Sequence, residues 1–60
     1  MPDLESVAPE HRHALAIAGY NWLPETGVWI NRRLGRAISF ETVRDHNAAW
    51  LKRWLQGGHA

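Results

Sequence analysis

The sequence predicts a small all-α domain of three helices, two of which form a helix-turn-helix-like pair. Apolar residues recur at helical spacing in separate stretches, and residues with turn or cap chemistry stand between them. A single helical domain would cover residues 1–60, with helices at about 7–22, 27–35 and 40–56. A chain of 60 residues buries only about 60% of its unfolded surface, so a domain of this size is marginally stable.

The first helix is expected over about residues 7–22, with Pro9 in its first turn. Pro24 ends it, because the residue before a proline avoids the helical region, and residues 24–27 have turn chemistry. One side of the helical wheel is apolar and predicts the buried face: Val7, His11, Ala14, Leu15, Ala18 and Trp22.

The second helix, over about 27–35, is expected to end at Gly35, a typical residue just after a last helical turn. Ser39 is a strong N-cap candidate for the third helix, and Glu41 suits its first turn. The third helix is expected over about 40–56, where its broad apolar side holds Phe40, Val43, Trp50, Leu51, Trp54 and Leu55.

A helix-turn-helix consists of a short helix that ends at a glycine, an apolar residue that fills the turn, and a longer helix with an N-cap. In that arrangement the second helix enters the major groove of DNA. Leu34, Ile38-Ser39, Thr42-Val43-Arg44 and His46 resemble the recognition-helix segment of LuxR/GerE-type response regulators, over about 17 residues of the 60. The resemblance implies that Thr42 and Arg44 contact DNA.

The segment also departs from that family. The turn between Leu34 and Ile38 is about two residues longer, and a tryptophan replaces the acidic residue before the isoleucine of the first helix. Residues 39–44 are similar to a segment of excisionases as well, which shows how general the short pattern is.

Charge is unevenly spread along the chain. Residues 1–25 carry four acidic residues and one arginine, net −3, whereas residues 26–60 carry six basic and two acidic residues, net +4. A basic half suits a polyanion partner, although the two halves can also attract one another. The DNA-contacting residues would be Arg32, Arg33, Arg36, Thr42, Arg44, Asn47 and Lys52.

Two functions therefore remain open. The first is a small DNA-binding regulator acting as a homodimer, with DNA as its partner. The second is a helical protein-protein interaction module, an accessory subunit or inhibitor, docking through a tryptophan-rich face. The carboxylates of Glu41 and Asp45 on the outer side of the third helix favour the second function. The docking residues would be Trp29, Trp50, Leu51 and Trp54.

Other classes of protein are not expected. The chain has no cysteine, and on a helix His11 and His13 face nearly opposite directions, so neither a metal site nor a cofactor is predicted. No nucleophile–base pair or carboxylate dyad stands out, so we expect neither an enzyme nor a small-molecule substrate. The acidic N-terminus lacks signal-peptide character and no run is long enough to span a membrane, which predicts a cytoplasmic protein.

Overall fold

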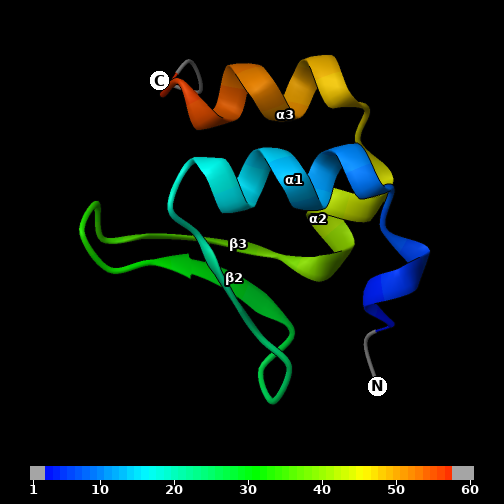
Figure 1. Cartoon of the computed structure of the whole chain (residues 1–60), viewed down its shortest axis with the longest axis horizontal. Coiled ribbons are helices and arrows are strands. Elements are labelled where there is room, and N and C mark those ends of the chain that lie inside the picture. Colours follow the sequence, from blue (N-terminus) through cyan, green and yellow to red (C-terminus); the bar gives the residue numbers. More distant parts are fainter. Residues whose placement is uncertain (1–2, 58–60) are drawn as a thin grey trace.

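The computed structural model describes residues 3–57 and shows a mixed α/β domain (Figure 1). The prediction of an all-α fold is wrong, because the middle of the described chain forms a three-stranded antiparallel sheet of order β1-β2-β3. In chain order the elements are the 3-10 helix η1 (Leu4–Ser6), α1 (Pro9–Ile17), β1 (Asn21–Leu23), β2 (Val28–Asn31), β3 (Arg36–Ser39), α2 (Phe40–Asp45) and α3 (Ala48–Leu55).

The first predicted helix is present but shorter than the expected 7–22. It ends at Ile17, and Gly19 follows with φ +93°, a backbone conformation that L side chains rarely adopt. The expected last turn is instead β1, which carries Trp22 opposite Trp29 of β2. Tryptophan suits both positions, because large aromatic side chains pack well on the pleated surface of a sheet.

The second predicted helix, 27–35, does not exist. Residues 28–31 are β2, in which half-buried and buried residues alternate, and residues 32–35 form the turn into β3. Gly35 has φ +66°, which fits a hairpin turn as well as the end of a helix. Valine, tryptophan and isoleucine at positions 28–30 favour a strand, and pairing with two neighbours decided in its favour. The turn predicted at residues 24–27 is confirmed, as the link from β1 to β2.

The third predicted helix, 40–56, is two helices. Ser39 caps α2 as expected, because its Oγ accepts a hydrogen bond of 3.2 Å from the backbone nitrogen of Thr42. The chain then becomes extended at His46, and Asn47 caps α3 by accepting from the backbone nitrogen of Trp50 at 2.8 Å. The side chain of an asparagine can bond to nearby backbone N–H groups, so it can end a continuous helix and cap the start of a new one.

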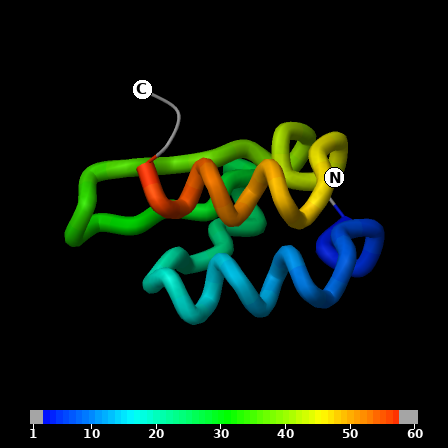
Figure 2. The backbone as a smooth tube through the Cα atoms, turned by 90° about the horizontal axis from the view of Figure 1, so that it is seen from above, coloured from blue at the N-terminus to red at the C-terminus, as the bar shows by residue number. Residues whose placement is uncertain are grey.

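The three α-helices lie on one side of the sheet. α1 and α3 are side by side and run in the same direction, and α2 lies where β3 ends (Figures 1 and 2). Between helices and sheet lies the core, whose members are Val7, Leu15, Tyr20, Trp29, Ile38, Phe40, Val43 and Leu51. Within residues 3–57, none of the helices has both the length and the apolar character needed to cross a membrane.

Candidate nucleic-acid interface

The turn between β2 and β3 is anchored by a buried asparagine. Asn31 is 1% exposed, and its Nδ2 donates to the carbonyl oxygen of Ala18 at 3.0 Å. Its Oδ1 accepts from the backbone nitrogen of Leu34 at 3.1 Å. One amide therefore links the end of α1 to the turn and shapes the turn itself, so the turn is held in place rather than loose.

The anchored turn presents two arginines to solvent. Arg32 and Arg33 are exposed, and within residues 3–57 neither makes a hydrogen bond or an ion pair. Leu34 beside them is also exposed, at 47% of its surface. Two arginines and an apolar side chain on a fixed turn can contact phosphates and the edges of bases.

Arg36 connects this turn to the end of α3. Its guanidinium donates to the carbonyl oxygen of Trp54 at 2.9 Å, and its Cζ lies 4.0 Å from the centroid of the indole ring. The last turn of α3 also carries Lys52 and Arg53, both exposed. We call the β2–β3 turn with Arg36 and the last turn of α3 the basic end of the molecule.

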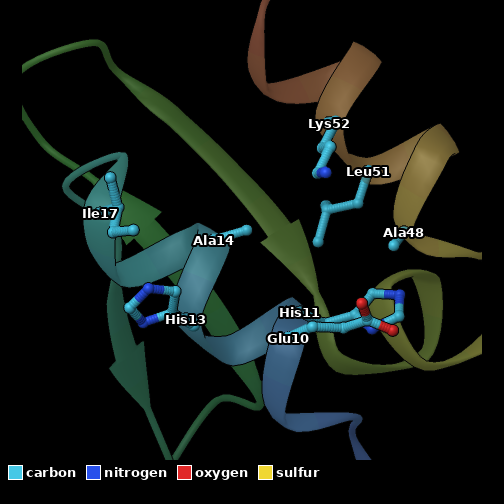
Figure 3. A pocket seen from close by; sticks show the side chains of 8 residues that line it. All are labelled: Glu10, His11, His13, Ala14, Ile17, Ala48, Leu51 and Lys52. Atoms are coloured by element: carbon cyan, nitrogen blue, oxygen red, sulfur yellow. The ribbon is translucent and has the colours of Figure 1, made fainter.

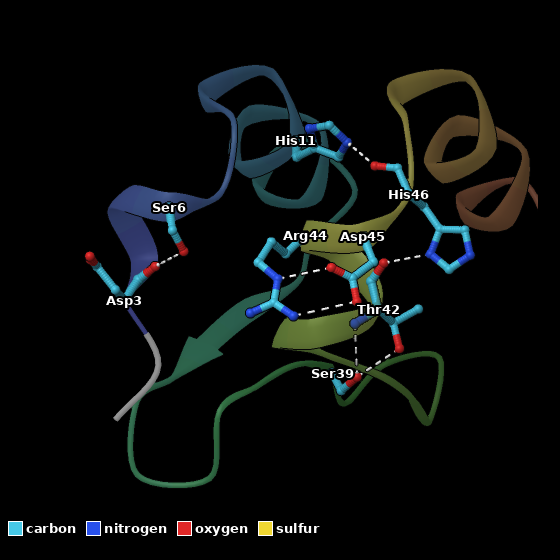
Figure 4. A network of polar contacts seen from close by, with 8 residues as sticks. All are labelled: Asp3, Ser6, His11, Ser39, Thr42, Arg44, Asp45 and His46. Atoms are coloured by element: carbon cyan, nitrogen blue, oxygen red, sulfur yellow. Dashed lines mark hydrogen bonds and ion pairs between the residues drawn. The ribbon is translucent and has the colours of Figure 1, made fainter.

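The three other predicted DNA contacts lie around α2 and the start of α3 and have structural partners. The hydroxyl of Thr42 lies 2.7 Å from that of Ser39, inside the cap of α2 (Figure 4). The Nε of Arg44 donates to Asp45 at 2.9 Å. The side chain of Asn47 caps α3. The structure therefore does not bring these residues together with Arg32 and Arg33.

The Arg44–Asp45 pair changes the acidity of both groups. The hydrogen bond to Asp45, together with its negative charge, raises the pKa of Arg44 above its ordinary value. The same hydrogen bond lowers the pKa of Asp45. Both side chains are largely exposed, so this pair contributes little to stability and leaves a nearly neutral site on α2.

The predicted docking residues do not form one free surface. Trp29 and Leu51 are 3% and 1% exposed and belong to the core. Trp50 is half-buried and stacks on the ring of His46, with centroids 3.9 Å apart. Trp54 is half-buried between Arg36 and Tyr20. The tryptophans mainly build the fold, and Trp22 and Trp29 form a tilted pair with centroids 4.4 Å apart.

A shallow groove of about 260 Å³ runs between α1 and α3 (Figure 3). Ile17 stands at its rim with 72% of its surface exposed. His11 is not free to act in the groove, because its Nε2 donates to the carbonyl oxygen of His46 at 3.0 Å. Across residues 3–57, no three histidine, aspartate or glutamate side chains are placed to hold a metal ion. The groove is lined by Glu10, His11, His13, Ala14, Ile17, Ala48, Leu51 and Lys52.

Comparison with known proteins gives no match to a family model, to a curated protein or to a solved structure. The fold and the site define the protein as a small compact α/β domain with a tryptophan-rich aromatic cluster. On its described surface, the basic end includes the hairpin turn that Asn31 anchors.

Sequence reasoning found the arginines of the basic end but placed them on a helix. It missed the anchoring role of Asn31, because the carbonyl it binds lies 13 residues away in the sequence. The local signal was the dipeptide Asn31-Arg32 followed by Gly35, since asparagine and glycine at this spacing are frequent in turns. Considered with the strand-forming residues 28–30, this signal would have favoured a hairpin.

Proposed function

We propose that this protein is a small, non-enzymatic, cytoplasmic protein that binds duplex DNA through the β2–β3 turn. The observation that carries the proposal is the separation of charge in the fold. Five of the seven lysine and arginine residues lie on the β2–β3 hairpin or on α3: Arg32, Arg33, Arg36, Lys52 and Arg53. None of the six acidic residues lies on these elements.

The shape of the basic end suits the major groove. Two paired strands lie about 4.8 Å apart, and the major groove of B-form DNA is about 12 Å wide, so it admits a two-stranded ribbon. An arginine on such a ribbon can bind the edge of a guanine, and an exposed leucine can contact a thymine methyl group. Arg32, Arg33 and Leu34 supply these groups at the tip.

The other basic residues would hold the phosphate backbone. Arg36 is fixed against Trp54, and Lys52 and Arg53 extend the positive surface along the last turn of α3. This mode of binding replaces the helix-turn-helix, because the expected first helix of that motif is a strand and a turn.

The proposal is tested by titrating labelled duplex DNA of random sequence with the protein at about 50 and about 200 mM salt. We expect salt-dependent binding, and the variant Arg32→Ala/Arg33→Ala should bind more weakly, with the slope of log K against log [salt] reduced by up to about two.

The matched control is Arg44→Ala, which removes another exposed arginine, one that is paired with Asp45 on α2. It should bind DNA nearly as well as the parent protein. The absence of salt-dependent binding at low ionic strength would overturn the proposal, and so would an equal loss in Arg44→Ala.

A further inference from the structure

The sheet has a second face, turned away from the helices, and four of its six residues are apolar. The other two, Asn21 beside Ile30 and Ser39 beside Val28, lie at opposite corners of this face. Strand register places Leu23 beside Val28, and Ile30 beside Ala37, on the face opposite to Trp29 and Ile38. Leu23, Val28 and Ile30 are half-buried and Ala37 is exposed, yet none of them packs against the core. We call these four residues the outer face.

An outer face of this composition is unusual for a sheet in water. An antiparallel sheet with helices on one side normally alternates apolar residues inward with polar residues outward. Here apolar side chains occupy both sides of β2, because Val28 and Ile30 point away from the side on which Trp29 is buried. Covering these side chains would remove apolar surface from water, which favours association.

The charges at the two ends of the outer face identify the partner. The β1–β2 turn at one end carries the exposed carboxylate of Glu25, and the β2–β3 turn at the other end carries Arg32 and Arg33. When a second copy faces the first with its strands running the opposite way, the negative end of each outer face meets the positive end of the other. We infer that two copies of this chain associate through their outer faces to form a symmetric sandwich of two sheets.

Charge also selects the direction of the two-fold axis. A face-to-face pair has its axis in the plane between the sheets. An axis along the strands would stack Glu25 on Glu25 and the arginines on arginines, which is repulsive. An axis across the strands places Glu25 of each copy near Arg32 and Arg33 of the other. The sheets would lie about 10 Å apart, with the basic ends at opposite ends of the dimer.

The size of the face determines the strength of the association. Three strands about 4.8 Å apart, of three or four residues at about 3.4 Å per residue, cover only about 200 Å² per copy. Stable protein–protein interfaces bury about 800 Å² per partner. The dimer is therefore weak, and it forms at protein concentrations near about 0.1 to 1 mM.

The test is sedimentation equilibrium of the whole chain, without DNA, from about 10 µM to about 1 mM. The mass should rise from 6.9 kDa toward twice that value. Ile30→Glu should remain a monomer at every concentration. The matched control Ile17→Glu, which alters the exposed isoleucine at the groove between α1 and α3, should dimerise like the parent.

A second set of variants avoids the sheet altogether. Glu25 lies on an exposed turn, so Glu25→Arg is expected to fold normally and to weaken the dimer several-fold. The triple variant Glu25→Arg/Arg32→Glu/Arg33→Glu should restore association, because it exchanges the charges at the two ends. A monomer at about 1 mM would overturn the inference. Loss of the dimer in Ile17→Glu with retention in Ile30→Glu, or no effect of Glu25→Arg, would also overturn it.

This inference does not depend on DNA binding. DNA titration of Ile30→Glu separates DNA binding from dimer formation. If this monomeric variant binds DNA, the proposed function is supported, and the mass measurement alone decides whether the dimer exists. Salt separates them further. It weakens DNA binding strongly, whereas the apolar part of the outer face is insensitive to screening.

Discussion

Asn31 is the residue that joins the hairpin turn to the first helix. Its amide is almost fully buried, and both its donor and its acceptor are used, by Ala18 and by Leu34. A Cβ atom added at Gly19 would lie 3.3 Å from the Nδ2 of Asn31, so the end of α1 approaches this amide closely. The position of Arg32 and Arg33 thus depends on a neighbour that itself carries no charge.

Replacing this residue should therefore be costly. Asn31→Ala leaves the partly buried carbonyl of Ala18 and the backbone N–H of Leu34 without their hydrogen-bond partner, and we expect the free energy of unfolding to fall by about 1 to 3 kcal/mol. The measurement is urea denaturation at low protein concentration. Asn21→Ala, at an exposed position of β1, is the control and should change stability by less than about 0.5 kcal/mol. Equal effects in the two variants would contradict the anchoring role.

At the scale of elements, helix ends and hairpin turns use the same residue types, such as serine, asparagine and glycine. This explains which elements the sequence predicts correctly and which it does not. Ser39 was correctly identified as a cap and residues 24–27 as a turn, because both signals are local. The prediction of a helix end at Gly35 is wrong, because a positive φ angle serves a helix end and a hairpin turn equally well. Pairing with β1 and β3 made Val28–Asn31 a strand, and such pairing is not visible in a helical wheel.

The break between α2 and α3 leads to a prediction about Asn47. Asn47→Ala removes the side-chain acceptor for the backbone nitrogen of Trp50, and it should lower the free energy of unfolding by about 1 kcal/mol. Asn47→Asp keeps an acceptor at the helix N-terminus and should retain stability. Both are measured by thermal unfolding followed by circular dichroism. An unchanged stability in Asn47→Ala would mean that the bond from His11 to the carbonyl of His46 creates the break instead.

For the whole molecule, small size and an apolar outer face have a common consequence. A chain of 60 residues has a small core and a low stability, and any association of folded copies adds to that stability by mass action. The dimer inferred above is therefore visible in unfolding experiments as well as in mass measurements.

We expect the melting temperature of the protein to rise by a few degrees between about 10 µM and about 1 mM. In Ile30→Glu the melting temperature should be independent of concentration, whereas Ile17→Glu should behave like the parent. Differential scanning calorimetry measures this directly. A parent melting temperature that does not depend on concentration would argue against association of the folded state.

The sequence by itself determined the local features of this protein: the presence, though not the end, of a first helix with Pro9 in its first turn, the turn at 24–27, the cap at Ser39 and the basic character of the second half. These depend on neighbours a few residues apart. The tertiary structure alone decided that Val28–Asn31 is a central strand and that Trp29 and Leu51 are core residues. It also placed Arg32 and Arg33 on a hairpin turn, because strand pairing and burial depend on contacts between distant parts of the chain.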